Sequence, residues 1–360
     1  MIDGAPRRDE SGRRATSSRV SGATTVLVIG GAGYVGSGLV RHLLERGYRV
    51  RVIDNLLYGG EAIADLAGHA RFELMVDDFR RARAVEAAVR GVEAVVHLGA
   101  IVGDAACAVD QDLTVQTNLD ATRLLIARAK SAGVRRFLLA STCSVYGASE
   151  GELDERSPLN PVSLYADTKI AAEEALKTAQ DVDFGSTSLR FATLYGISSR
   201  PRFDLAVNLL TARAVTEGRI TIHGGDQWRP FVHVDDVARA TVLALEAPLE
   251  AIAGEVFNIG STDENYRLSR VGEIIAEVVP GVEVGTNHQL HDRRSYNVNF
   301  DKLRDRLGFR ASHTVRSGVE EVRDLIALGR IGDYRDPRHD NFRYLTEVAA
   351  HRRLPVSARD

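Results

Sequence analysis

The chain has 360 residues, of which 44% are hydrophobic, and its formal net charge is −3 at pH 7. This length suits one large α/β unit or two closely joined domains, and the small negative charge argues against a basic surface for nucleic acid. No apolar run approaches the roughly 20 residues of a membrane span, and the two cysteines, Cys107 and Cys143, form neither a disulfide framework nor a metal-ligand pattern. We therefore expect a cytoplasmic protein with no bound metal and with neither nucleic acid nor membrane as a partner.

The N-terminal segment 1–24 is rich in Arg, Ser and Gly and lacks the apolar stretch of a secretory signal, so we expect a disordered tail. After this segment, short apolar runs alternate with helical patterns. Strands are expected at 24–30, 48–54, 71–78, 93–100, 135–142 and 186–196. Helices are expected from the first glycine cluster to about residue 46, and at 80–90, 114–131 and 163–180. The alternation predicts an α/β fold with a Rossmann-like, doubly wound parallel sheet.

The regular alternation ends near residue 196, which predicts a smaller C-terminal lobe built from interleaved segments. We expect the first domain to comprise 25–190 plus about 230–262, and the lobe to comprise about 191–229 and 263–330. Residues 331–360 are rich in Arg, Asp and Tyr, and we expect them to form an extended C-terminal arm.

A glycine-rich turn follows the first expected strand. GGAGYVG at 30–36 fits the pattern Gly-x-Gly-x-x-Gly. Glycines at this spacing allow a tight strand-to-helix turn and let backbone amides approach a pyrophosphate at the helix N-terminus. Asp54 ends the next expected strand 18 residues after Gly36, where a carboxylate accepts hydrogen bonds from ribose hydroxyls and repels a 2′-phosphate. The combination predicts a dinucleotide site that favours NAD over NADP.

A second chemical signal is the pair Tyr165 and Lys169, in the stretch YADTK. Residues four apart lie on one face of a helix, and a lysine ammonium beside a phenol favours the phenolate. Such a tyrosine is suited to remove a proton from an alcohol whose carbon loses hydride. The upstream stretch ASTCSVYG at 140–147 offers several potentially reactive side chains, among them Thr142, Cys143 and Ser144.

Together these segments resemble the extended short-chain dehydrogenase/reductase superfamily, and within it the nucleotide-sugar epimerase/dehydratase family, closest to the 4-epimerases. The likeness runs from about 25 to 310. It implies that the first domain binds NAD and that the lobe binds a nucleotide-diphospho-sugar substrate. The cofactor-binding residues that it implies are Gly30, Gly33, Tyr34, Val35, Asp54, Asn55, Asp78, Phe79, Leu98, Gly99, Ala100, Asn118, Tyr165 and Lys169.

The same resemblance implies substrate contacts and an assembly. RPFVHVDDVARA at 229–240 resembles a block whose leading arginine binds substrate phosphate, which implies that role for Arg229. Asn208 matches an asparagine that touches the nucleotide diphosphate, and Asp292 and Arg293 are expected at the nucleotide. The family also implies a homodimer formed through a four-helix bundle.

The family's mechanism implies one role for each catalytic residue. Tyr165 takes a proton from a sugar hydroxyl, Thr142 hydrogen-bonds to that hydroxyl, and Lys169 holds the nicotinamide ribose and tunes the tyrosine. In the 4,6-dehydratases the threonine is followed by Asp-Glu, whereas here Cys143 and Ser144 follow it. This difference favours C4 epimerisation through a transient 4-keto sugar.

Other reactions stay open at the level of the sequence. They are a 4-keto-sugar reductase, a C3/C5-epimerase/reductase that uses Cys143 as acid/base, a decarboxylating dehydrogenase, and an NAD-binding sensor without catalysis. We expect Cys143 to be a small residue lining the pocket more than an acid/base.

Overall fold

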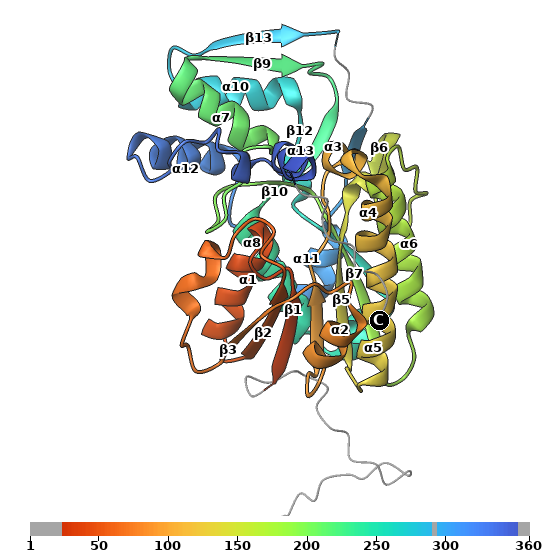
Figure 1. The fold of residues 1–360 in the computed structure, drawn as a ribbon. Helices are drawn as coiled ribbons and strands as arrows, with labels where there is room; N and C mark the ends of the chain where they lie inside the picture. Colours follow the sequence, from red (N-terminus) through yellow and green to blue (C-terminus); the bar gives the residue numbers. More distant parts are fainter. Residues whose placement is uncertain (1–23, 290–293, 352–360) are drawn as a thin grey trace, which may run out of the picture.

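The computed structural model describes residues 24–289 and 294–351 (Figure 1). Seven parallel strands form its central sheet, in the order β11-β7-β5-β4-β1-β2-β3. They are β1 (Thr25–Ile29), β2 (Arg49–Asp54), β3 (Phe72–Val76), β4 (Ala94–His97), β5 (Arg136–Thr142), β7 (Gly185–Phe191) and β11 (Glu255–Ile259). The predicted doubly wound parallel sheet is confirmed.

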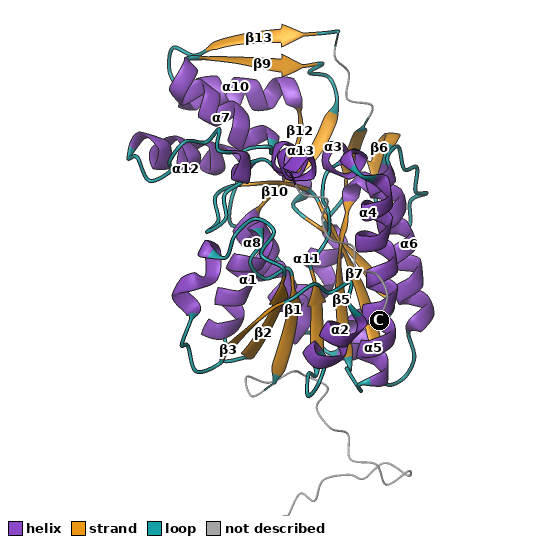
Figure 2. Cartoon of the chain, in the orientation of Figure 1, coloured by secondary structure: helices purple, strands orange, loops and turns teal. Residues whose placement is uncertain are grey.

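Helices cover both faces of the sheet because successive side chains of a buried strand point to opposite sides. Along β1, Val26 and Val28 pack on one face, and Leu27 and Ile29 pack on the other. The first face is covered by α1 and α8, and the second by α2, α5 and α6 (Figure 2). These helices are α1 (Tyr34–Glu45), α2 (Ala82–Ala88), α5 (Ala121–Ser131), α6 (Leu164–Ala179) and α8 (Val234–Glu246).

A smaller lobe lies beyond the carboxyl ends of the strands (Figure 1). Its helices are α7 (Ala206–Glu217), α10 (Leu268–Val278) and α12 (Val315–Ala327). Three small sheets join β8 (Thr193–Tyr195), β10 (Trp228–His233) and β12 (Asn265–Arg267); β9 (Arg219–His223) and β13 (Glu283–Asn287); and β6 (Ala148–Leu153) and β14 (Ser295–Val298). Shorter helices are α3 (Asp104–Val109), α4 (Gln111–Val115), α9 (Leu249–Ile252) and α11 (Asp301–Leu307). The lobe is interleaved with the first domain in sequence, since β11 returns to the central sheet.

The helix expected at 114–131 is interrupted by a wider turn. Gln116–Asp120 is a π-helical segment between α4 and α5. A π turn holds one residue more than an α turn, and such turns often lie at functional sites. Asn118, a predicted cofactor residue, lies in this turn and is buried.

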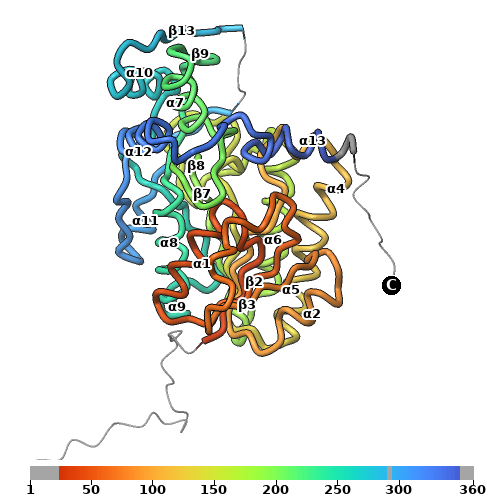
Figure 3. The backbone as a smooth tube through the Cα atoms, turned by 60° about the vertical axis from the view of Figure 1, so that its left-hand side comes forward, coloured from red at the N-terminus to blue at the C-terminus, as the bar shows by residue number. Residues whose placement is uncertain are grey.

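The C-terminal segment differs from the expected extended arm. It contains a short 3-10 turn at Pro337–His339 and a further helix, α13 (Asn341–His351). The helix forms because Asn341 and Leu345, four residues apart, are both buried against the body of the protein. It lies beside α3 (Figure 1), and Figure 3 shows the same helix from another side. The expected N-terminal tail, apart from Thr24, lies outside the described residues.

Candidate active site

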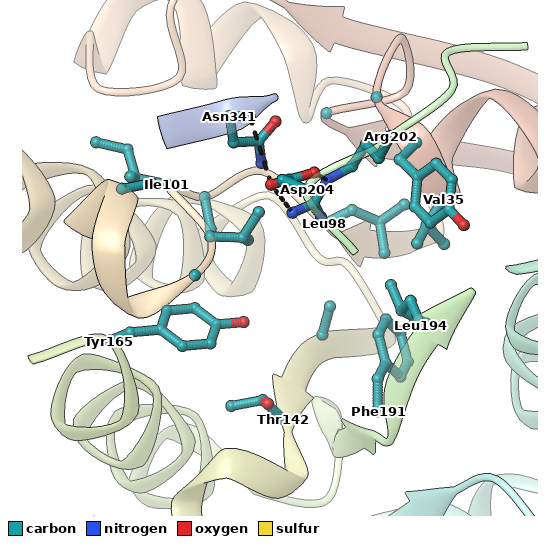
Figure 4. A pocket seen from close by; sticks show the side chains of 18 of the residues that line it. Val35, Leu98, Ile101, Thr142, Tyr165, Phe191, Leu194, Arg202, Asp204 and Asn341 are labelled. Atoms are coloured by element: carbon teal, nitrogen blue, oxygen red, sulfur yellow. Dashed lines mark hydrogen bonds and ion pairs between the residues drawn. The ribbon is translucent and has the colours of Figure 1, made fainter. Parts of the chain in front are cut away.

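The carboxyl ends of the central strands open into a cavity of about 650 Å³. Ligands in open α/β sheets bind at this edge, beside the point where the strand order reverses. The strand order reverses between β1 and β4. The predicted site residues that line the cavity are Gly30, Gly33, Tyr34, Val35, Asp54, Asn55, Asp78, Phe79, Leu98, Gly99, Ala100, Thr142, Tyr165, Lys169 and Arg229. Figure 4 shows Val35, Leu98, Thr142 and Tyr165 around this space.

The turn between β1 and α1 requires glycine at two positions. Gly30 has φ +80°, and a Cβ there would lie 2.9 Å from the backbone nitrogen of Gly99. A Cβ on Gly36 would lie 2.2 Å from the carbonyl oxygen of Gly30. These close approaches bring the first turn of α1 to the cavity wall, where Tyr34 and Val35 line the space. The positive end of the helix dipole therefore faces the cavity, which fits the pyrophosphate of a dinucleotide.

Asp54 is held at the end of β2 by the backbone. Its Oδ2 accepts a hydrogen bond from the amide of Ala32 at 3.0 Å, and its Oδ1 accepts one from the amide of Leu56 at 2.8 Å. Burial raises the pKa of Asp54, and these two amides oppose the rise. The carboxylate is thus fixed in direction at the cavity edge, as a ribose-binding group must be.

The predicted catalytic pair lies at the start of α6. Ser163 caps this helix by accepting a hydrogen bond from the amide of Ala166 at 3.3 Å. Tyr165 and Lys169 then follow on one face, and the Lys169 Nζ lies 6.0 Å from the centroid of the Tyr165 ring. Lys169 also donates a hydrogen bond from Nζ to the carbonyl oxygen of Ala140, at 2.8 Å. That bond ties the helix to β5, the strand that ends in Thr142.

Burial shifts the pKa values of both residues of the pair. It raises the pKa of Tyr165, and the neighbouring Thr142 side chain opposes this rise. It lowers the pKa of Lys169 to about 8. The positive charge that opposes the rise in the pKa of Tyr165 is that of Arg202, which lines the same cavity.

Cys143 does not line the cavity. Its side chain is fully buried in the core on the α1 and α8 side of the sheet. Its Sγ donates a hydrogen bond to the carbonyl oxygen of Arg190 at 3.3 Å, and burial raises the pKa of the thiol. The thiol is therefore held protonated behind the wall, while Thr142 and Ser144 line the cavity.

We predict that Cys143→Ala leaves turnover within about threefold of the unmodified protein, because an acid/base role contributes about 10²-fold or more. Turnover is measured at a temperature where circular dichroism shows that both proteins are folded. Thr142→Ala serves as the control at the neighbouring position and is expected to lose activity. If turnover by Cys143→Ala fell by about 10²-fold, Cys143 would have to be an acid/base after all.

Two predicted asparagines hold cavity loops in place and do not line the cavity themselves. Asn118 accepts a hydrogen bond from the amide of Ile101 at 2.8 Å and donates one to its carbonyl oxygen at 2.9 Å. Asn208 likewise accepts from the amide of Gly196 at 2.9 Å and donates to the carbonyl oxygens of Gly196 and Arg202, each at 2.8 Å. Both side chains therefore set the shape of a loop that borders the site.

Arg229 lines the cavity from β10. Its Nη1 donates to the carbonyl oxygen of Trp228 at 2.8 Å and also to that of Arg294, and its Cζ lies 5.2 Å from the centroid of the Tyr296 ring. The guanidinium is thus positioned at the lobe side of the cavity. Asp292 and Arg293, the other predicted nucleotide contacts, lie outside the described residues.

The structure adds cavity residues that the sequence did not indicate. The loop before α7 contributes Arg200, Arg202 and Asp204. Arg202 Nη2 forms an ion pair with Asp204 Oδ2 at 2.6 Å, and burial together with the neighbouring Arg202 lowers the pKa of Arg200 to about 10. Helix α13 contributes Asn341, Phe342 and Leu345. In the sequence, the only indication that this loop belongs to the site is the dense charge of the stretch SRPRFD at 199–204.

Comparison with known proteins identifies relatives of two activities. The chain is 32% identical over 324 residues to a UDP-glucose 4-epimerase of Corynebacterium glutamicum, covering 82% of this chain and 94% of that protein. It is 30% identical over 317 residues to a dTDP-glucose 4,6-dehydratase of Streptomyces niveus, covering 82% and 91%. The crystal structure of UDP-glucuronic acid 4-epimerase from Bacillus cereus, with UDP-glucuronic acid and NAD bound, superposes with a TM-score of 0.75 at 27% identity, covering 85% of this chain and 99% of that one.

In the part that the structure describes, no helix is long and apolar enough to cross a membrane.

A family model extends these similarities to a defined part of the chain. The model of the NAD dependent epimerase/dehydratase family matches residues 26–260. This range contains the glycine turn, Asp54, Thr142 and the Tyr165–Lys169 pair. The resemblance inferred from these motifs is confirmed, with NAD as the cofactor of the family: the chain belongs to the NAD-dependent epimerase/dehydratase family.

Proposed function

We propose that the chain is a nucleotide-sugar 4-epimerase that keeps its hydride on bound NAD. The observation that carries this proposal is the shared cavity: Thr142, Tyr165 and Lys169 line it together with the glycine turn and Asp54. An alcohol placed beside the tyrosine is therefore also within the space available to the cofactor. The glycine turn, Asp54 and Lys169 are the residues that hold the cofactor.

The chain's own residues orient the sugar hydroxyl and accept its proton. Thr142, at the end of β5, orients the sugar hydroxyl, and Tyr165 as phenolate accepts its proton. Because burial raises the pKa of Tyr165, its deprotonation depends on positive charge nearby; Arg202 opposes the rise, and Lys169 takes the same role in this proposal from its place on the same helix face. NAD, when bound, would supply the hydride acceptor and donor for an inversion at C4.

A 4,6-dehydratase is the alternative that the relatives raise. Elimination of water needs an acid and a base beside the reacting carbons. The two positions after Thr142 hold a buried thiol, Cys143, and a hydroxyl, Ser144, whose Oγ lies 3.3 Å from the Tyr296 hydroxyl. Neither is a carboxylate, which supports epimerisation over elimination. A 4-keto-sugar reductase uses the same tyrosine and threonine, so only the products and the consumption of cofactor distinguish a reductase from an epimerase.

The substrate proposed is a nucleoside-diphosphate sugar. Arg229 offers a guanidinium to the diphosphate from the lobe side, and bidentate contacts make arginine well suited to phosphate. The Bacillus cereus structure contains UDP-glucuronic acid and the C. glutamicum relative is named for UDP-glucose, which makes UDP-sugars the first substrates to test. A homodimer remains part of this proposal.

The test is product analysis with the purified full chain. UDP-, dTDP-, GDP- and ADP-sugars, including hexoses, uronates and heptoses, are incubated separately and the products are identified by NMR. An epimerase gives a C4-inverted sugar with no net change in nicotinamide absorbance and no need for added NAD. A dehydrated product, or stoichiometric consumption of NADH or NADPH, overturns the proposal.

The role of Asp54 in cofactor choice is a separate prediction. Asp54→Ala removes charge-assisted hydrogen bonds worth about 1.5–3 kcal/mol to a ribose hydroxyl pair, so NAD affinity falls roughly tenfold or more. NADP affinity falls less, because the lost carboxylate also repelled its 2′-phosphate. Calorimetric titration of both cofactors measures the ratio, with the exposed Asp65→Ala as control. An unchanged ratio removes Asp54 from this role.

A further inference from the structure

Helix α13 forms part of the cavity wall although it lies beyond the region matched by the family model. The model ends at residue 260, and α13 covers Asn341–His351. The helix therefore adds side chains to the cavity that the matched family region does not contain.

Polar contacts fasten the start of α13 to the loop before α7. Arg200 Nη2 donates to Asn341 Oδ1 at 2.7 Å and to the carbonyl oxygen of Arg338 at 3.1 Å. The amide of Phe203 donates to the carbonyl oxygen of His339 at 2.8 Å. Arg200 and Asn341 are both buried. Figure 4 shows Asn341 beside Asp204 above the cavity, with Tyr165 below.

Apolar contacts fasten the same helix to the first domain. Leu345 belongs to a buried cluster with Ile101 and Cys107, and Leu57 and Tyr165 pack against that cluster. One turn of helix thus connects the segment that follows Asp54, the loop after β4, and the tyrosine proposed as base.

Aromatic contacts extend this attachment toward Asp54. The Tyr344 ring lies 5.3 Å from the Tyr58 ring, and the Cζ of Arg200 lies 4.0 Å from the centroid of that second ring. Tyr58 follows Asp54 by four residues and also lines the cavity. Helix α13 therefore covers the space between the proposed ribose carboxylate and Tyr165.

We propose that α13 is a wall of the NAD site that retains the cofactor between turnovers. The inference rests on the proposed epimerase function, because an epimerase regenerates its cofactor in every cycle and needs no exchange. For such an enzyme a wall over the site keeps bulk water out and the keto sugar in without slowing turnover. NAD leaves when α13 separates from Leu57, Ile101 and the Arg200 loop, so the strength of these contacts sets the release rate.

The experiment measures release of radiolabelled NAD from the full-length holoprotein after addition of excess unlabelled NAD. Leu345→Ala removes the buried contact at the centre of α13 and is expected to speed release at least about tenfold, since a buried leucine truncation weakens local packing strongly. Phe342→Ala is the second variant, because this side chain lines the cavity while 47% exposed, so its truncation is expected to cost less stability than that of the buried Leu345. Leu328→Ala, which truncates a leucine that is 70% exposed, is the matched control and keeps the original rate.

The release assay contains no sugar, so its outcome is separate from that of the product analysis. Faster release in both α13 variants supports the wall even if the reaction proves to be a reduction. Release at the original rate in both variants overturns it, whether or not their melting temperatures fall, because α13 would then serve stability alone.

Discussion

Tyr165→Phe is expected to abolish most turnover, by about 10²–10⁴-fold, while leaving NAD binding within a few fold. The substitution removes the phenol that lies beside Thr142 at the cavity (Figure 4). Its neighbours cannot replace it as a base, because the Cys143 thiol is buried away from the cavity and Lys169 carries a proton at neutral pH. The cofactor keeps its glycine turn and Asp54. Product formation by NMR and calorimetric titration with NAD measure the two effects independently.

Tyr146→Phe is the matched control for this prediction. The Tyr146 hydroxyl donates to Asn258 Oδ1 at 2.8 Å and accepts from Arg190 Nη1 at 3.0 Å, and the side chain is fully buried behind the strand end. Its loss lowers stability through a broken hydrogen bond and leaves the chemistry in place. Normal turnover by Tyr165→Phe would show that the proton leaves by another group and would reject the proposed mechanism.

The largest effect on stability is expected from Arg190→Met, at about 3–5 kcal/mol lost from the free energy of unfolding. Arg190 and Glu173 form a buried ion pair, with Nη2 2.7 Å from Oε2 and side-chain exposures of 5% and 8%. Ser141 also donates a hydrogen bond to this carboxylate. Methionine fills the space but leaves the charge of Glu173 unpaired in the core. Urea unfolding at neutral pH, followed by circular dichroism, measures the change.

Two further variants make the interpretation unambiguous. Arg156→Met breaks an exposed pair with Asp154, in which the arginine side chain is 92% exposed, and is expected to change stability by less than about 1 kcal/mol. Adding Glu173→Leu to Arg190→Met removes the stranded charge and is expected to restore part of the loss. If Arg190→Met unfolds at the same urea concentration as the unmodified chain, the buried pair contributes nothing to the fold.

The sequence predicted those parts of the site that local patterns control. Tyr165 and Lys169 share a helix face because they are four residues apart, and the glycine turn follows from its own spacing. Thr142 and Cys143 take opposite environments at a strand end, so one borders the cavity and the other enters the core. The motif indicates that either residue could be catalytic. Which of the two side chains is buried in the core depends on packing with other segments.

Other parts of the site depend on contacts between distant segments. Arg200 meets Asn341 across 141 residues of chain, and no local pattern connects them. The richness of residues 331–360 in Arg, Asp and Tyr predicts an extended arm, yet the buried Leu345 and Asn341 side chains hold a helix against the body of the protein. The resemblance implies a cofactor contact for Asn118, and in the structure the π turn directs its side-chain amide to the backbone of Ile101.

Both native thiols of the chain are shielded, since Cys107 and Cys143 have no exposed surface. The chain contains just these two cysteines, so alkylating dyes should label the folded protein poorly without any engineering. A cysteine introduced at the exposed Thr346 would then carry a fluorophore on α13 by itself. Such a labelled protein turns separation of the helix from α3 into an optical signal that can be followed in real time.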